Sequence, residues 1–151
     1  MKIHLIAVGK IKDRIIRSKI EEYFEKRARG YEVVVRELPD GKGNPAAMIK
    51  EEADRILAAL PARAYIAVLD ERGENPDTLQ FAELIRKAAN RGLDLAFVLG
   101  GPYGLDERVR QRADQVLALS KLTFTHELAR LVLAEQVYRA LSIIKGTPYH
   151  H

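Results

Sequence analysis

Residues 93–105 read LDLAFVLGGPYGL, an apolar run interrupted only by Asp94 that stops at a group of glycines. Such a run is typical of a strand that is buried on both faces of a parallel sheet. Asp106 is suited to cap a short helix after the glycines. We therefore expect a strand, a glycine-rich loop and a helix, and the loop either approaches a ligand closely or only forms a tight turn.

The same alternation of strand and helix extends in both directions from this segment. Strand patterns occupy residues 2–8, 31–38, 64–69, 93–99 and 116–119. Helical spacing of apolar residues covers 13–29, 46–60, 77–90, a short segment after Asp106, and 126–145. This order predicts an α/β fold with a parallel sheet covered by helices on both faces. Ligands of such sheets bind beyond the carboxyl ends of the strands, so the loops after Leu69, Leu99 and Leu119 are the candidate sites.

Length and composition narrow the class of protein. The chain has 151 residues, of which 47% are apolar and 30% charged, and we expect a single soluble domain over 1–151. Cysteine is absent, which excludes disulfides, thiolate metal sites and a cysteine nucleophile, and fits a reducing cytoplasm. Charged residues interrupt even the most apolar segment, 126–145, so we expect no membrane span, and residues 2–8 are interpreted as a strand instead of a signal peptide.

The positive charge is concentrated near the two ends of the sequence. There are 25 Lys and Arg against 21 Asp and Glu, a net charge of +4. Basic residues exceed acidic ones between residues 10 and 36 and again after 119, whereas the middle is slightly acidic. This pattern favours a polyanionic partner, although a solvated helix face with Glu–Lys pairs is the better explanation for residues 20–29 taken alone.

The sequence lacks the motifs of several common classes of enzyme and binding site. The spacing of Gly100, Gly101 and Gly104 does not match the dinucleotide-binding pattern, and no phosphate-binding loop is present, so kinases and dehydrogenases are disfavoured. Ser120 does not lie in the nucleophile motif of serine hydrolases. The four histidines show no pair at metal-binding spacing apart from the terminal dipeptide, and we expect no metal.

The segment 120–145 combines polar residues at its start with a helix that is apolar nearly all round. Such a helix needs cover on more than one side: the sheet can cover one side, and a second copy of the chain is the natural cover for the other. Glu135 and Arg139 within it form either an intersubunit ion pair or part of a site. His126 and Arg130 lie one turn apart on one face, where an RNA phosphate or base could meet both.

Six segments together resemble a known family over the whole chain. They are 7–10 (AVGK), 69–70 (LD), 100–105 (GGPYGL), 120–126 (SKLTFTH) with Arg130, 135–140 (EQVYRA) and 148–150 (PYH). This combination resembles the ribosomal RNA large subunit methyltransferase H family, which belongs to the SPOUT class of knotted methyltransferases. Thr125 is a departure, because the family usually has proline there.

The resemblance implies a homodimer with a trefoil knot in the C-terminal half, at about residues 64–151. It also implies S-adenosylmethionine as methyl donor, without a metal, and N3 of a pseudouridine in 23S rRNA of the assembled ribosome as acceptor. By position, the cofactor contacts would be Leu69, Gly100, Leu119, Ser120, Lys121, Leu122, Thr123 and Phe124.

Methyl transfer to N3 needs an aligned nucleophile and removal of a proton. We expect His126 and Arg130 to line the reaction centre, and Tyr149 and His150 to close it, in the same chain or in the partner. Either histidine could be the base, or both could have only structural roles. The alternative function is a ribosome- or RNA-binding module with another methylation target or without catalysis, and calorimetry with S-adenosylmethionine distinguishes it.

Overall fold

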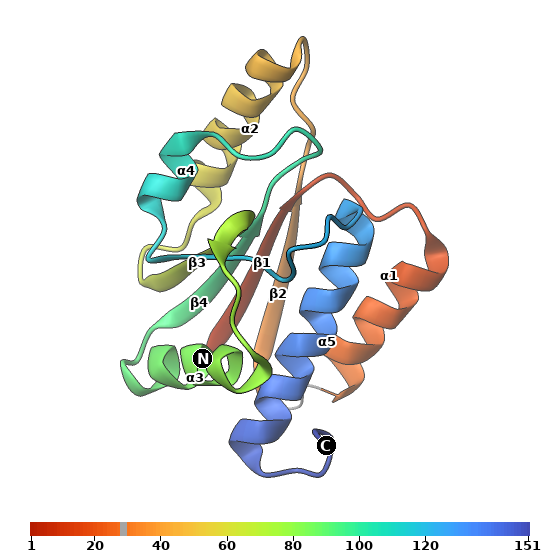
Figure 1. Cartoon of the computed structure of the whole chain (residues 1–151), viewed down its shortest axis with the longest axis vertical. Helices are drawn as coiled ribbons and strands as arrows, with labels where there is room; N and C mark the ends of the chain where they lie inside the picture. The colour runs from red at the N-terminus through yellow and green to blue at the C-terminus, as the bar shows by residue number, and fades with distance from the viewer. Residues whose placement is uncertain (28–29) are drawn as a thin grey trace.

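The chain forms one sheet of parallel strands. The computed structural model describes residues 1–27 and 30–151. Its sheet has five strands in the order β2-β1-β4-β3-β5, and all paired strands are parallel (Figure 1). The strands are β1 (Lys2–Val8), β2 (Glu32–Leu38), β3 (Ala64–Glu74), β4 (Asp94–Leu99) and β5 (Gln115–Leu117). The predicted parallel sheet is therefore confirmed.

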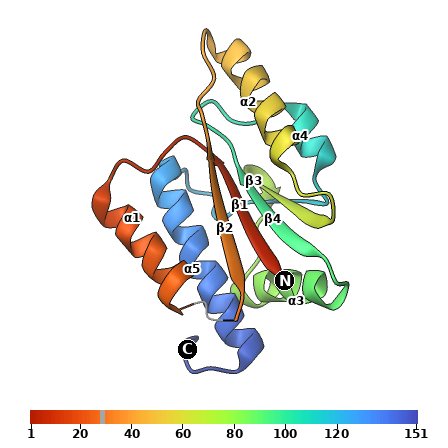
Figure 2. The same cartoon turned by 180° about the vertical axis from the view of Figure 1, so that it is seen from behind.

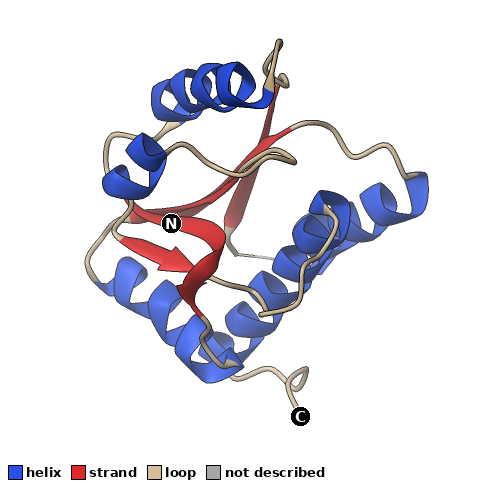
Figure 3. Cartoon of the chain, turned by 45° about the horizontal axis from the view of Figure 1, so that its top comes forward, coloured by secondary structure: helices blue, strands red, loops and turns tan. Residues whose placement is uncertain are grey.

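Helices cover both faces of this sheet. They are α1 (Arg14–Glu21), a π-helical turn η1 (Glu22–Arg27), α2 (Pro45–Ala59), α3 (Thr78–Asn90), α4 (Glu107–Arg112) and α5 (His126–Lys145). Figures 2 and 3 show α2 and α4 on one face and α1, α3 and α5 on the other. The three-layer arrangement predicted from the alternation of patterns is confirmed.

Each layer of helices encloses its own apolar core because strand side chains alternate between the faces. In β1, Leu5 faces the core formed with α1, α3 and α5, whereas Ile6 faces the core formed with α2 and α4. In β4, Phe97 and Val98 divide in the same way, and all four side chains are buried. Burial on both faces explains why these strands are apolar runs in the sequence.

The strand that begins at Ala64 is longer than predicted. The sequence predicts a strand to Leu69 and then a loop over 70–76, but β3 continues to Glu74 with a shift of register between Leu69 and Glu74. Glu74 pairs with Leu117 of β5, and its carbonyl accepts a hydrogen bond from the Ala118 N–H at 2.7 Å. A Cβ at Gly73 would lie 2.6 Å from the Val116 backbone, so glycine permits this close approach.

The first predicted helix, 13–29, is divided. Asp13 caps α1 by accepting from the Ile15 and Ile16 N–H groups, and the regular helix ends at Glu21 before the π-helical turn. Residues 28 and 29 lie outside the described residues. The last predicted strand, 116–119, instead covers Gln115–Leu117.

Helix α5 begins and ends where the sequence predicts. It packs against α3, α1 and the sheet, and Leu133, Val137 and Leu141 are buried there. The sheet, α1 and α3 therefore cover one side of α5, whereas Leu128 remains 44% exposed, and cover of the other side by a second subunit stays a prediction. Within the described residues, no helix is both long and apolar enough to cross a membrane.

Candidate active site

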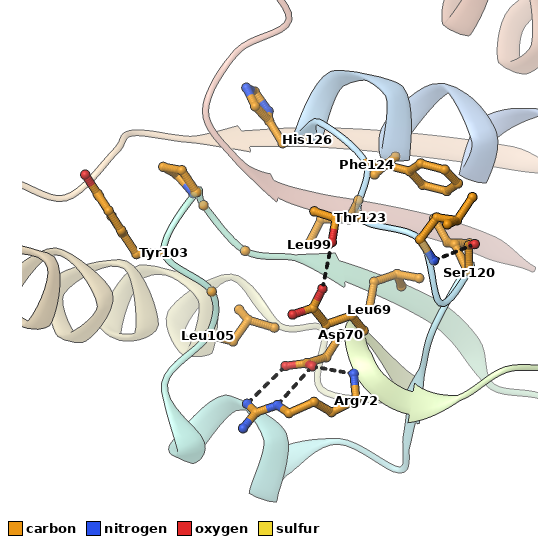
Figure 4. A pocket seen from close by; sticks show the side chains of 18 of the residues that line it. Leu69, Asp70, Arg72, Leu99, Tyr103, Leu105, Ser120, Thr123, Phe124 and His126 are labelled. Atoms are coloured by element: carbon orange, nitrogen blue, oxygen red, sulfur yellow. Dashed lines mark hydrogen bonds and ion pairs between the residues drawn. The ribbon is translucent and has the colours of Figure 1, made fainter.

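A cavity of about 570 Å³ lies at the carboxyl ends of β3, β4 and β5. Three loops and the start of α5 line it, and their labelled side chains converge in Figure 4. Seven predicted cofactor residues contribute to its wall: Leu69, Gly100, Leu119, Ser120, Leu122, Thr123 and Phe124. Lys121 is exposed and does not line the cavity. A larger cavity of about 940 Å³ beside α3 contains none of the predicted site residues.

The glycine-rich loop is both a tight turn and a wall of this cavity. The Gly104 N–H donates to the Gly101 carbonyl at 3.1 Å, and Gly104 has a φ of +91°. A Cβ at Gly100 would lie 2.7 Å from the Leu105 side chain and 3.0 Å from the Gly104 carbonyl oxygen. The two roles that the sequence left open for these glycines are therefore compatible, because the turn brings bare backbone to the cavity.

Residues 119–125 form the opposite wall. The Ser120 hydroxyl accepts from the Leu122 N–H at 3.0 Å, and the Thr123 hydroxyl donates to Glu71 at 3.4 Å, both drawn in Figure 4. Thr125 caps α5 by accepting from the Leu128 N–H at 3.3 Å. A hydroxyl cap thus begins the helix at the position where the family usually has proline.

Asp70 is one of four charged lining residues that the sequence did not assign to the site, beside Glu71, Arg72 and Arg110. Its side chain lines the cavity, is 8% exposed, and accepts hydrogen bonds from Arg110 at 2.8 Å and from Arg72 at 3.3 Å. Burial acts to raise the pKa of Asp70 from 3.8, but the bonds from Arg72 and Arg110 outweigh it and hold the pKa at about 2. Asp70 is therefore ionised at neutral pH. In the sequence, its position directly after the apolar run 64–69 was the feature that could have identified it as a site residue.

Replacing Asp70 with asparagine is expected to lower the free energy of unfolding at pH 7 by about 1–2 kcal/mol. Because the pKa is lower in the folded state, this stabilisation is present above about pH 4 and is lost as the pH falls through about 2. Urea denaturation of both proteins at several pH values measures the difference. Glu107→Gln, which changes an exposed partner of the same Arg110, is the control. If the difference in the free energy of unfolding between the two proteins stayed constant down to pH 2, the low pKa of Asp70 would be contradicted.

His126 borders the cavity at the first turn of α5. Its side chain is exposed, and a Cβ built on Gly9 would lie 3.8 Å from His126 Cε1 and 3.3 Å from Asp40 Oδ1. The ends of β1 and β2 therefore lie beside the histidine. Glu127 holds the loop between β1 and α1, because its carboxylate accepts from the Lys12 N–H at 2.6 Å and the Asp13 N–H at 3.0 Å.

Arg130 is buried instead of facing the cavity. It is 3% exposed, its guanidinium lies 2.8 Å from Glu37 Oε2, and it donates to the Gly9 carbonyl at 3.1 Å. Burial acts to raise the pKa of Glu37, but the Ile11 N–H and Arg130 outweigh it and lower the pKa. Arg130 thus fixes the end of β1 next to His126, and direct contact with a substrate stays a prediction.

Tyr149 and His150 lie at the other end of α5. The Tyr149 hydroxyl donates to Glu135 at 3.0 Å, and His150 Nδ1 lies 3.2 Å from an Arg139 nitrogen. Helices rise about 1.5 Å per residue, so Glu135 is already about 13 Å along the axis from His126. Within one chain, the structure therefore does not bring Tyr149 and His150 to the cavity.

Two charged residues of α5 hold these tail residues. Arg139 forms an ion pair with Glu135 at 2.6 Å, inside one helix and not between subunits. The Arg139 guanidinium also lies 4.8 Å from the centre of the Tyr149 ring, and that ring packs edge-on against Tyr138. Burial raises the pKa of Tyr149, and Tyr23 and Glu135 add to the shift. These contacts hold the tail residues Tyr149 and His150 against α5, away from the cavity.

In the part of the chain that the structure describes, no three His, Cys, Asp or Glu side chains are grouped so that they could hold a metal ion.

Comparisons with known proteins identify the family. A family model described as "Predicted SPOUT methyltransferase" matches residues 1–150. The ribosomal RNA large subunit methyltransferase H of Anaeromyxobacter sp. (strain Fw109-5) is 40% identical over 152 residues and 99% of each chain. The protein of the same name from Trichlorobacter lovleyi is 41% identical over 156 residues and the full length of both chains.

A solved structure supports the fold. A protein named as a probable methyltransferase from Bordetella pertussis Tohama I has a TM-score of 0.62 at 17% identity, over 92% of this chain and 93% of that chain. At this identity the likeness concerns the fold alone. The full-length matches in sequence establish more: the chain belongs to the SPOUT methyltransferase family, among its ribosomal RNA large subunit methyltransferase H members.

Proposed function

We propose that this protein transfers a methyl group from S-adenosylmethionine to N3 of a pseudouridine in 23S rRNA, acting in the cytoplasm as a homodimer on the assembled ribosome. The observation that carries the proposal is the cavity, because seven of the eight residues implied as cofactor contacts line it. The names of the relatives support an rRNA substrate. The trefoil knot also stays a prediction from the resemblance.

The residues of the cavity fit the proposed cofactor. Its volume of about 570 Å³ lies in the usual range for small-molecule sites. Leu69, Leu99 and Phe124 offer apolar surface for an adenine ring, and the ionised carboxylate of Asp70 makes the floor suitable for a cationic ligand. Arg72, also in the lining, could meet a carboxylate. When bound, S-adenosylmethionine supplies an electrophilic methyl group on its sulfonium.

The protein's own contribution is positioning and proton removal. The fixed glycine turn and the 119–125 loop hold the donor side in one geometry. N3 of the acceptor must lose a proton as the new bond forms, and His126 borders the cavity where a base is needed. His150 is the other candidate, provided that the tail reaches a cavity. Arg130 holds the end of β1 beside His126 through its hydrogen bond to the Gly9 carbonyl.

Alanine substitutions distinguish the two histidines. Removal of a general base is expected to slow single-turnover methylation of ribosomes by about 10²–10⁴-fold. His126→Ala and His150→Ala are measured beside His151→Ala, which removes a neighbouring exposed histidine and should leave the rate within about twofold. Raising the pH should partly restore a variant that lacks the base, since hydroxide then removes more of the N3 proton. Full rates in both variants would exclude a histidine base.

The position of the tail supports the proposed dimer. Tyr149 and His150 are held at the end of α5 remote from the cavity of their own chain. A second copy packed so that its cavity meets this tail would complete both sites by symmetry. Exposed Leu128 near the cavity provides apolar surface for such a contact.

The RNA substrate requires cations near the cavity mouth. Lys10 and Lys12 follow β1, Lys42 follows β2 and Lys121 follows β5, all exposed and at the carboxyl edge of the sheet. Phosphate contacts from such residues position RNA without reading its sequence.

Mass spectrometry of 23S rRNA tests the proposed function in the cell. A strain without this protein should lack one methyl group, on a pseudouridine, and re-expression of the wild-type chain should restore it. Unchanged rRNA methylation in that strain would refute the proposal. Isothermal titration calorimetry adds the cofactor: a chain that does not bind S-adenosylmethionine would favour an RNA-binding module without catalysis.

A further inference from the structure

Glu52 is a buried carboxylate that the proposed chemistry does not use. It lies on α2 and is only 3% exposed. Among the side chains of residues 1–25 and 30–151, no basic group forms an ion pair with Glu52, in contrast to buried Arg130, which pairs with Glu37. Removing a carboxylate from water without a cationic partner is costly, so its retention points to a structural task that its oxygens perform.

One oxygen of Glu52 holds the loop between β2 and α2. Glu52 Oε2 accepts from the Gly41 N–H at 2.8 Å. Neighbouring residues of α2 hold the same loop: Glu51 accepts from the Lys42 N–H at 3.0 Å, and Arg55 donates to two carbonyl oxygens, also at 3.0 Å. The helix thus fixes residues 39–42 through both their N–H and C=O groups.

The other oxygen of Glu52 faces the glycine turn of the cavity. A Cβ built on Gly101 would lie 2.8 Å from Glu52 Oε1 and 3.3 Å from Oε2, so a larger residue there would have to displace the carboxylate. The Gly101 backbone therefore rests directly on the carboxylate. Gly101 accepts the hydrogen bond that closes the turn, and Tyr103 and Leu105 of the same turn line the cavity in Figure 4.

The loop held by Glu52 reaches the other side of the site as well. Asp40 follows β2 and, with His126, flanks Gly9, at 3.3 Å and 3.8 Å from the position of a Cβ there. A single carboxylate therefore contacts both the turn that walls the cavity and the loop that lies beside His126.

We propose that Glu52 is a positioning residue that braces the glycine turn, residues 100–104, against the β2–α2 loop, residues 39–44, and so fixes the cofactor wall relative to His126. The link to the cofactor rests on the proposed function, whereas the brace itself is a property of the fold. Neither the resemblance nor the names of the relatives assign Glu52 a role.

Hydrogen exchange on the ligand-free protein tests the brace. Glu52→Gln keeps the size of the side chain but weakens the bond to the Gly41 N–H and replaces one acceptor oxygen with an amide donor. Exchange should accelerate about tenfold in peptides that cover both 39–44 and 100–105. Glu51→Gln, which alters the same loop without touching Gly101, should accelerate exchange only in 39–44. Glu52→Ala should repeat the Glu52→Gln pattern more strongly.

Unchanged exchange over 100–105 in both Glu52 variants would overturn the proposal, as would a uniform rise over all peptides, which indicates a general loss of stability. Calorimetry with S-adenosylhomocysteine gives the second readout. We expect Glu52→Gln to weaken binding about tenfold and Glu51→Gln to leave it within twofold. Failure of the wild type to bind would refute the proposed function, while the exchange pattern would still decide the brace.

Discussion

Heterodimers that combine two inactive chains are expected to recover about half of the wild-type methyl transfer, because one of their two symmetric sites is complete. One chain carries Gly100→Val, which forces a side chain into Leu105 and the Gly104 carbonyl and so blocks the cavity. The other carries Tyr149→Ala and His150→Ala, which removes the tail groups from the far end of α5. The intact cavity of the second chain then meets the intact tail of the first.

The experiment uses co-expression with two different tags, tandem purification and single-turnover methylation of ribosomes. Each altered homodimer should be at least about 100-fold slower than wild type. Recovery in the heterodimer also shows that both chains fold. If the tail acts on the cavity of its own chain, neither site of the heterodimer is complete, so heterodimers as inactive as the homodimers would contradict the proposed arrangement.

Replacing Arg130 with methionine is expected to lower the free energy of unfolding by about 3 kcal/mol, since it leaves a carboxylate without its buried partner. Glu37 loses its shorter ion pair, at 2.8 Å, and keeps the longer one with Arg17, at 3.7 Å, while the Gly9 carbonyl loses a hydrogen bond at 3.1 Å. For a domain of this size the melting temperature should fall by about 6–12 °C. Thermal unfolding followed by circular dichroism gives the value.

Arg36→Met is the matched control for Arg130, because Arg36 is an exposed arginine on β2 beside Glu37. It should change stability by no more than about 0.5 kcal/mol. A melting temperature of Arg130→Met equal to that of the control would show that the buried pair contributes nothing net. In that case the arginine would be free to act on a substrate, as the sequence alone suggested.

Local patterns predicted most of the fold because the signals for each element are short-range. Strand β1 was predicted with its observed bounds from one apolar run. Helix α5 was predicted from residue 126 to 145, where a threonine cap begins it and Gly146, at a φ of +72°, ends it. The three loops of the cavity follow from the rule for parallel sheets, which needs only the order of strands.

Features that depend on distant residues could not be predicted from such patterns. The extension of β3 to Glu74 depends on pairing with β5, and Gly73 was its only local sign. The burial of Arg130 depends on Glu37, a residue of another strand. Helical spacing placed Arg130 on the same face of α5 as His126. It could not show that this face is exposed at His126 but buried one turn later, at Arg130. The place of Tyr149 depends on its contacts with Glu135 and Tyr138 of α5.

Methyl transfer is tested most simply with a labelled methyl group on S-adenosylmethionine and purified ribosomes that lack the modification, followed by mass spectrometry of the rRNA. We expect one methyl group per ribosome, on N3 of a pseudouridine in 23S rRNA, with wild-type protein and almost none with Gly100→Val. Label that is absent from 23S rRNA, or a Gly100→Val protein as active as wild type, would contradict the proposed function.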